Sequence, residues 1–341
     1  MTLTVDFGPN DIVKQIEKTG IKGQHLIFID DYSSTELENI FKTAEMLEPF
    51  WRNRIPLLEG KILCTQFFQP STRTRFSHET AMFRLGGNVI TESNPLVSSA
   101  AAKGESLYDS LRVTSQYADV IVLRHPDEGV IDTIEQLGSD ASPIISGGYG
   151  NVTHPTQGLL DMYTAYRALG GDFKKMTVMI ATPDLSRARS GQSFGLGLAR
   201  MGSKLIYSGT TGLGVPPVIR AKLKAMNANF TEVNDLTIGQ HEEMLADEGV
   251  DLLYRPGCSV KKGDPGRDDF LKKMAEFYFT LEGLQKIKQK SGKTVGLMHS
   301  LPRNEGEFDF AIDASEHELY FKQIGFSVPL RMSLLANICG V

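Results

Sequence analysis

The sequence predicts a two-domain α/β protein, in which each domain is a parallel sheet flanked by helices. Its 341 residues are enough for about two domains of ordinary size. Short β-rich runs alternate with segments of helical periodicity, and this alternation is typical of parallel sheets covered by helices. A long helical segment at residues 154–169 interrupts the alternation, which then begins again. We therefore expect the domain boundary in that helix.

Composition narrows the class of protein. Hydrophobic residues make up 41% and charged residues 23% of the chain, which excludes wholesale disorder. With 36 basic and 41 acidic residues the formal charge is −5, so coating of nucleic acid by charge is weakly supported. No run approaches the ~18 apolar residues of a membrane span, and the N-terminal residues lack the apolar core of a signal peptide. We expect neither nucleic acid nor membrane as a partner.

The three cysteines are Cys64, Cys258 and Cys339. They are far apart and odd in number, so they fit neither a complete disulfide framework nor a zinc-ligand spacing. A reducing compartment suits them better. We therefore expect a cytoplasmic protein without a metal site.

In the first half of the chain, a helix is expected at residues 33–47, with Ser33 and Glu36 forming its capping box. A second helix is expected at residues 74–85, ended by two glycines. The β-rich runs of this half are residues 25–30, 62–68, 119–123 and 143–145.

In the second half, a final helix is expected at residues 329–339, and it could pack on either domain. His241 lies next to Glu242 and Glu243, so we expect it on a solvated helix face. The β-rich runs of this half are residues 177–181, 204–207, 251–254 and 295–298.

The segment Phe-Phe-Gln-Pro-Ser-Thr-Arg-Thr-Arg at residues 67–75 predicts a phosphate site. A strand runs into Pro70, and a helix begins near residues 71–74. The first turn of a helix offers unpaired N–H groups and the positive end of the dipole. Hydroxyls and arginine donate well to phosphate oxygens. Helix capping alone would need only one such side chain, whereas this turn carries Ser71, Thr72, Arg73 and Thr74.

Nucleotide motifs fit less well. Residues 291–294 end like a P-loop, but Ile287 stands where its first glycine belongs. The glycine-rich runs 195–202 and 209–214 do not form G-x-G-x-x-G after a strand. A nicotinamide-dependent dehydrogenase is therefore the weakest alternative.

The phosphate segment resembles the carbamoyl phosphate signature of the aspartate and ornithine carbamoyltransferases. The likeness covers about residue 25 to the end of the chain. Other segments resemble the motifs of that family in the right order: Lys103-Gly-Glu-Ser with Ser99 before it, Arg124-His-Pro, His154-Pro-Thr-Gln with Leu-Leu-Asp161, Asp184-Leu with Arg189, His299-Ser-Leu-Pro-Arg, and Tyr320-Phe-Lys-Gln through Arg331.

The resemblance implies roles for these residues in binding carbamoyl phosphate. The phosphate would be held by Ser71, Thr72, Arg73 and Thr74, and the carbamoyl group would be surrounded by Arg124, His154 and Gln157. Ser99 and Lys103 would reach into the site of a neighbouring subunit, which implies a homotrimer with shared active sites. The catalytic residues implied are Arg73, Lys103, Arg124, His154 and Gln157.

The resemblance also implies the reaction. A neutral amine would attack the carbamoyl carbon directly, and the departing phosphate would take the proton, so no protein nucleophile, metal or cofactor is expected. The implied domains are residues 25–155 for carbamoyl phosphate and 156–318 for the amino acid, with a C-terminal helix at 319–341 packing on the first domain. Residues 1–24 look like an extension, and the sequence does not settle whether a regulatory subunit binds.

Four positions depart from the family pattern. Gln69 stands where a charged residue is usual, and Ser300 stands where the aspartate branch has proline and the ornithine branch has cysteine. The aspartate branch holds its amino acid with an Arg and a Gln, and the corresponding positions are Gly257 and Ser259. The remaining candidates for binding the amino acid are Arg189, Arg255, Ser259, Leu301 and Pro302, with Lys261 and Lys262 nearby.

The acceptor is left open by these departures. L-aspartate is the first expectation; it would give N-carbamoyl-L-aspartate and phosphate, a step of pyrimidine biosynthesis. The alternatives are another amino acid or amine as acceptor, or a protein that binds carbamoyl phosphate without turnover, since the departures lie outside the Ser-Thr-Arg-Thr turn.

Overall fold

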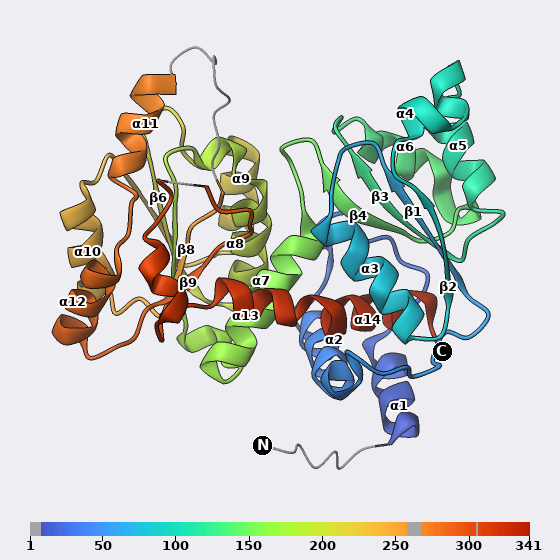
Figure 1. The fold of residues 1–341 in the computed structure, drawn as a ribbon, viewed down its shortest axis with the longest axis horizontal. Helices are drawn as coiled ribbons and strands as arrows, with labels where there is room; N and C mark the ends of the chain where they lie inside the picture. Colours follow the sequence, from blue (N-terminus) through green and yellow to red (C-terminus); the bar gives the residue numbers. More distant parts are fainter. Residues whose placement is uncertain (1–7, 258–266, 305) are drawn as a thin grey trace. The chain divides into compact units, whose positions relative to one another are not determined.

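The computed structural model describes residues 8–257, 267–304 and 306–341. The chain forms two compact units (Figure 1). Unit 1 comprises Met1–Leu160 and Phe326–Val341, and unit 2 comprises Asp161–Gly325. The division falls inside helix α7, Pro155–Leu169.

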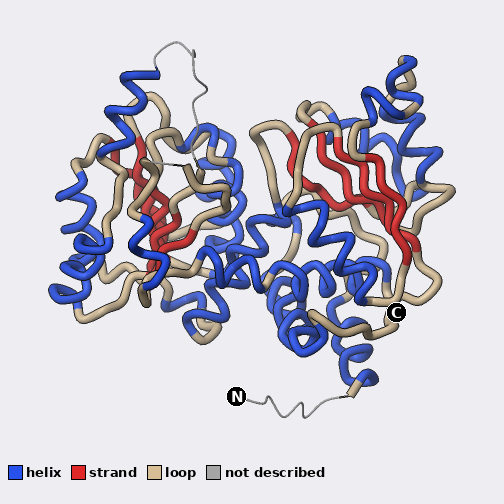
Figure 2. The backbone as a smooth tube through the Cα atoms, viewed as in Figure 1, coloured by secondary structure: helices blue, strands red, loops and turns tan. Residues whose placement is uncertain are grey.

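Unit 1 is built on a four-stranded parallel sheet in the order β2-β1-β3-β4. Strands are drawn in red in Figure 2. Helices α5 and α6 contribute Leu111 and Ile134 to one side of its core, where they meet Ile121 and Leu123 of β3. The elements that carry this unit are β1 (Ile62–Phe67), β2 (Asn88–Glu92), β3 (Val120–His125), β4 (Ile144–Tyr149), α3 (Arg73–Arg84), α4 (Pro95–Ser98), α5 (Leu107–Thr114) and α6 (Val130–Leu137).

Three further helices complete unit 1: α1 (Pro9–Thr19), α2 (Ser34–Leu47) and α14 (Ser327–Cys339). The predicted capping box of α2 is confirmed, because the Glu36 N–H donates to Ser33 Oγ at 3.2 Å and the Ser33 N–H donates to Glu36 Oε2 at 2.7 Å. Helix α14 packs on α2 and α3, and Ser333 Oγ donates to the carbonyl of Ile40 at 2.7 Å. The C-terminal helix thus returns to the first unit.

Unit 2 has a five-stranded parallel sheet in the order β7-β6-β5-β8-β9. The strands are β5 (Thr177–Ala181), β6 (Lys204–Gly209), β7 (Phe230–Asn234), β8 (Leu252–Tyr254) and β9 (Gly296–Met298). The helices are α8 (Arg189–Met201), α9 (Pro217–Ala225), α10 (Ile238–Asp247), α11 (Arg267–Ala275), α12 (Leu281–Ser291) and α13 (Tyr320–Gly325).

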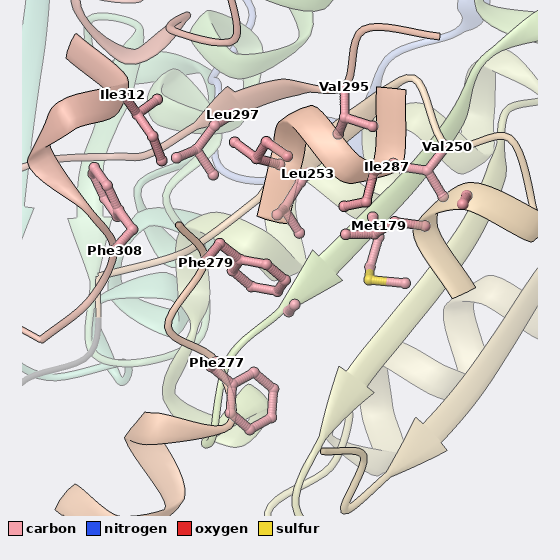
Figure 3. Packing of buried hydrophobic residues seen from close by; sticks show 14 of the residues in the cluster. Met179, Val250, Leu253, Phe277, Phe279, Ile287, Val295, Leu297, Phe308 and Ile312 are labelled. Carbon is pink, nitrogen blue, oxygen red and sulfur yellow. The ribbon is translucent and has the colours of Figure 1, made fainter. Parts of the chain in front are cut away.

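The core of unit 2 joins its sheet to its helices (Figure 3). Met179, Leu253 and Leu297, from three neighbouring strands, lie in one buried cluster with Ile287 of α12 and Phe279. Burial of such side chains stabilises the unit by ~1.5–3 kcal/mol each. This packing holds the carboxyl ends of β5, β8 and β9 in fixed positions.

Two predictions about individual segments are wrong. Residues 25–30 do not form a strand: Leu26 makes a single bridge to Ile145, and the 3₁₀ turn Ile29–Asp31 follows at once. His241 is fully buried rather than solvated, and its Nε2 lies 2.7 Å from Ser208 Oγ. Its acidic neighbours in sequence point elsewhere, because successive residues of a helix lie on different faces.

Strands β2 and β7 and helix α1 have no counterpart in the expected elements. Both strands lie at sheet edges and are largely unburied and polar, so they lack the apolar run that marks a central strand. None of the helices in the described ranges is long and apolar enough to cross a membrane.

Candidate active site

The strand order of unit 1 favours a ligand site at the carboxyl ends of β1 and β3. From β1 the chain moves to β2 on one side and later to β3 on the other, and ligands of open α/β sheets bind at such a reversal of strand order. Phe67 of β1 is paired with Arg124 of β3, and the Phe68 N–H donates to the Arg124 carbonyl at 2.9 Å. The predicted phosphate segment is thereby fixed beside Arg124.

The first turn of α3 carries the predicted phosphate ligands. The helix begins at Arg73, and its N-cap residue Thr72 makes no side-chain capping bond. Helix capping therefore does not account for the Thr72 hydroxyl. A pocket of about 350 Å³ lies here, with Gln69, Ser71, Thr72 and Arg75 among the residues that line it. Hydroxyls, a guanidinium and the N-terminal end of a twelve-residue helix suit an anion.

Thr74 is held in place by burial and by hydrogen bonds to its backbone carbonyl. Its side chain is buried, and its carbonyl accepts from His78 Nδ1 at 2.7 Å and from Ser77 Oγ at 3.1 Å. Burial, helped by the positive charge of Arg331, lowers the pKa of His78 to about 3. The histidine is therefore neutral at pH 7, and its N–H anchors the first turn of α3.

Arg124 and His154 meet at a glycine. Between Leu123 and His125 the β3–β4 register shifts, and Arg124 Nη1 donates to the Gly147 carbonyl at 3.0 Å. A Cβ built on Gly148 would lie 3.5 Å from Arg124 Nη1 and 3.4 Å from His154 Cδ2, at a φ of +112°. Glycine suits this position because of that backbone conformation, which other residues rarely adopt; the distances themselves are ordinary contacts. Gly148 is thus a further candidate site residue, which the sequence motifs did not indicate.

The N-terminus of α7 completes this group. The His154 carbonyl accepts from the Gln157 N–H at 3.0 Å, so two of the three predicted carbamoyl ligands lie at the start of one helix. Thr156 Oγ1 donates to the Ser146 carbonyl at 3.2 Å and lies 3.4 Å from His154 Nδ1. Thr156 thereby fixes the orientation of the imidazole, and the sequence motif gave no sign of this role.

Ser99 and Lys103 lie on a separate surface segment of unit 1. Ser99 Oγ donates to the Pro95 carbonyl at 2.7 Å and accepts from the Ala101 N–H at 3.2 Å, which starts the 3₁₀ turn Ala100–Lys103. The Lys103 side chain is exposed. Their predicted role in a neighbouring subunit is a property of an assembly and stays a prediction for this single chain.

Unit 2 has its own reversal of strand order, between β5 and β8. Arg189 begins α8, the helix that follows β5. Burial lowers the pKa of its half-buried guanidinium, which nevertheless stays cationic near neutral pH because the unperturbed value is so high. A cation at the start of this helix suits a carboxylate ligand.

Arg255 follows β8 and is fully buried. Its guanidinium donates to Thr182 Oγ1 at 3.1 Å, to the Pro256 carbonyl at 2.9 Å and to the Phe277 carbonyl at 3.3 Å. These bonds join the ends of β5 and β8, and a ligand could reach the guanidinium only by breaking them. Ser259, the other loop candidate, lies outside the described residues, as do Cys258, Lys261 and Lys262.

Leu301 and Pro302 lie in the loop after β9, joined by a cis peptide bond. The Leu301 N–H donates to His299 Nδ1 at 2.9 Å. His299 Nε2 lies 3.2 Å from Glu307 Oε2, and both side chains are fully buried. The sequence left His299 without an identified partner, because Glu307 is separated from it by a loop whose shape no motif records.

Among the described residues, no group of three or more His, Cys, Asp or Glu side chains is arranged to hold a metal ion. What the arrangement offers is a set of hydrogen-bond donors and cations at the strand ends of unit 1, and a cation of suitable charge for a carboxylate at the start of α8 in unit 2.

Comparison with known proteins agrees with this geometry. Residues 24–167 match the family model described as the carbamoyl-P binding domain of aspartate/ornithine carbamoyltransferase. The chain is 44% identical to a ureidoglycine carbamoyltransferase of Rubrobacter xylanophilus, over 95% of this chain and 94% of that protein. It is 39% identical to the aspartate carbamoyltransferase catalytic subunit of Methanocaldococcus jannaschii, over 92% and 97%.

Solved structures give the same result. The catalytic subunit of M. jannaschii aspartate transcarbamoylase superimposes with a TM-score of 0.78 at 36% identity, covering 93% of this chain and 99% of that one. Trypanosoma cruzi aspartate transcarbamoylase in complex with carbamoyl phosphate gives 0.80 at 26% identity, covering 94% and 98%. The chain therefore belongs to the aspartate/ornithine carbamoyltransferase family of transferases.

Proposed function

We propose that this protein transfers the carbamoyl group of carbamoyl phosphate to the amine of ureidoglycine, in preference to aspartate. The observation that carries the choice of acceptor is Gly257, which has no side chain at the position where the aspartate branch carries its carboxylate-binding arginine.

The donor half of the reaction is assigned to unit 1. Ser71, Thr72, Arg73 and Thr74 would hold the phosphate on the first turn of α3, supported by the buried bond from His78 to the Thr74 carbonyl. The domain of residues 25–155 that the sequence suggests would then be the carbamoyl phosphate-binding domain. The pocket beside this turn gives the proposal its strongest support.

The carbonyl oxygen of the donor gains negative charge as the amine attacks. Arg124 and His154, which both approach Gly148, would donate to that oxygen, and Gln157 on the same helical turn would contact the carbamoyl amide. Donors fixed before the reaction stabilise such charge strongly. The bond from the carbamoyl carbon to the phosphate oxygen breaks, and the leaving phosphate takes the proton from the attacking amine. Catalysis is then positioning and charge stabilisation.

The acceptor differs from aspartate in charge rather than in size. Ureidoglycine is an amino acid whose α-carbon carries a ureido group, which has as many heavy atoms as the carboxymethyl group of aspartate. Arg189 would bind the α-carboxylate in either case. The ureido group is neutral and rich in N–H donors, so it needs no arginine at position 257, whereas a buried carboxylate without one is poorly bound.

L-aspartate is the second candidate, favoured by the likeness to aspartate carbamoyltransferase catalytic subunits over most of the chain. In that case a residue of the 258–266 segment would have to bind the second carboxylate. N-carbamoyl-L-aspartate and a role in pyrimidine biosynthesis would then follow.

An acceptor panel tests the proposal. The purified protein is incubated with carbamoyl phosphate and ureidoglycine, aspartate, asparagine or ornithine, and phosphate release is measured. We expect saturable turnover with ureidoglycine at a kcat/KM well above that for aspartate. Preference for aspartate would overturn the choice of acceptor. Saturable binding of carbamoyl phosphate without turnover of any amine would point to a non-catalytic binder.

We further propose a cytoplasmic homotrimer in which Ser99 and Lys103 complete the site of a neighbour. Leu96 and Val97, just before these residues, are 59% and 73% exposed in the single chain, and exposed apolar side chains of this kind suit an interface. Mixing an inactive Lys103→Ala protein with an inactive Arg124→Ala protein should restore activity, because hybrid trimers contain intact sites. Absence of restoration in verified hybrids would contradict shared sites.

A further inference from the structure

A buried acid–imidazole pair lies directly beneath Gly257. A Cβ built on this glycine would lie 3.5 Å from His299 Cε1, 3.6 Å from His299 Nε2 and 3.8 Å from Glu307 Oε1. These are ordinary van der Waals distances, and the glycine does not have a left-handed φ. A side chain would therefore fit at position 257, and its first atom would touch both members of the pair.

Glu307 is held in place as a hydrogen-bond acceptor. Its Oε2 accepts from the Asn304 N–H at 2.6 Å, and the same oxygen lies 3.2 Å from His299 Nε2. Both side chains are fully shielded from solvent, where interactions between charges are screened less than in water. Gly257 itself is exposed, so a ligand group resting on it would be separated by a single glycine from the Glu307 carboxyl group and the edge of the His299 ring.

We infer that Glu307 sets the acceptor preference, by disfavouring an anionic side group over Gly257 and favouring a neutral group that carries N–H donors. This inference rests on the proposed function, because it concerns the acceptor of that same site. The physical reason is that two carboxylates at close range repel each other, whereas ureido or amide N–H groups are attracted to negative potential. Glu307 is a specificity-determining residue and takes no part in the chemistry.

A purely structural role for Glu307 predicts something different. If the residue only fixed Asn304 and the loop after β9, its loss would impair every acceptor by a similar factor. The informative quantity is therefore a ratio, namely kcat/KM for asparagine divided by kcat/KM for aspartate. The two side groups have the same number of heavy atoms and differ in charge, and the ratio does not require ureidoglycine to be the natural acceptor.

The experiment is a double-mutant cycle between positions 257 and 307, using phosphate release as the assay. The proteins are the wild type, Glu307→Gln, Gly257→Arg and the double variant. Glu316→Gln is the matched control, because Glu316 is a surface residue paired with Lys288. Where turnover is too slow, competitive inhibition by the two amino acids replaces kcat/KM.

We expect Glu307→Gln to lower the asparagine-to-aspartate ratio of kcat/KM by about tenfold, with the KM for carbamoyl phosphate unchanged. Gly257→Arg should shift it further in the same direction. The two changes should not combine as a simple product, because an arginine at 257 would touch Glu307; independent sites would multiply to within about twofold. The control should leave the ratio unchanged.

Two results would overturn the inference: an unchanged ratio in Glu307→Gln, or shifts that multiply as independent effects. If the Glu307 variant does not fold, Gly257→Arg and Gly257→Gln replace it, since they are similar in size and differ in charge. Equal ratios in these two proteins would then contradict a charge-based preference. Absence of ureidoglycine turnover in the wild type would count against the proposed acceptor alone.

Discussion

The two units share an architecture, but their strand ends differ in one respect: unit 2 carries a buried carboxylate there in addition to its arginines. In unit 1 the ends of β1, β3 and β4 lead to Arg73, Arg124 and His154, which suits an anionic donor. In unit 2 the loops after β8 and β9 bring Gly257 over the buried Glu307. Under the proposed function, the cations at the strand ends of unit 1 would hold the donor, and the buried carboxylate of unit 2 would act on the choice of acceptor.

The largest effect is expected from Arg73→Ala, on the kcat/KM for carbamoyl phosphate. Arg73→Ala removes the guanidinium from the first turn of α3, and we expect kcat/KM for carbamoyl phosphate to fall by about 10²–10³. Steady-state phosphate release measures it. Arg54→Ala, which removes an arginine from an exposed ion pair, is the control. Wild-type turnover by the Arg73 variant would remove the charge contrast between the two units.

The next effect concerns Arg255, whose guanidinium makes bonds within unit 2. Arg255→Met leaves buried carbonyl and hydroxyl groups without a donor, and we expect the free energy of unfolding to fall by about 3 kcal/mol. Denaturant unfolding measures it. Lys204→Met, at a partly exposed ion pair, should cost under about 1 kcal/mol. Unchanged stability together with a large rise in the acceptor KM would instead make Arg255 a ligand.

Acid should weaken both units through one buried histidine each. Burial lowers the pKa of His78 to about 3 and that of His241 to about 4, from an unfolded value near 6.5. Between these pH values the unfolded state binds more protons than the folded state. The contribution of each neutral histidine to the unfolding free energy is therefore present above pH 6.5 and is lost as the pH falls. From pH 7 to pH 5 each histidine should account for a loss of about 2 kcal/mol.

Denaturant unfolding at the two pH values checks this prediction with His78→Gln and His241→Gln. Each substitution should reduce the pH dependence of the unfolding free energy by about 2 kcal/mol. A dependence identical to that of the wild type would show that the histidine is not held neutral in the folded protein.

The smallest effect is expected away from both sites. Ser33→Ala removes the capping oxygen of α2, which accepts from the Glu36 N–H, and should lower the unfolding free energy by about 1 kcal/mol. Turnover should not change. A fall in kcat of tenfold or more would show that α2 influences the site, and the donor site could then no longer be described by its strand ends alone.

Local signals in the sequence account for much of the fold and for the proposed donor site. The Ser-Thr-Arg-Thr turn and the capping box of α2 each lie within a few consecutive residues; α3 begins inside the first, and the second is confirmed. The edge strands β2 and β7 escaped prediction because an exposed strand lacks an apolar run. His241 was misjudged because its neighbours in sequence are charged while its neighbours in space are Ser208 and Phe277.

The acceptor half was harder to foresee because its contacts are distant in sequence. Glu307 approaches Gly257 from another loop, and nothing in either segment marks the pairing. The resemblance alone was enough to show that position 257 lacks the arginine of the aspartate branch. The structure was needed to show that His299 and Glu307 lie beneath this glycine. It was also needed to show that Arg255, two residues earlier, is fully buried.

The most direct test is the ratio of kcat/KM for ureidoglycine to that for aspartate, measured with the wild-type protein and saturating carbamoyl phosphate. A neutral ureido group over Gly257 should be favoured by about 100-fold or more, since a buried carboxylate without its arginine loses roughly 3 kcal/mol of recognition. A ratio below one would contradict the account, because it would mean that an anionic side group is preferred at a position that faces Glu307.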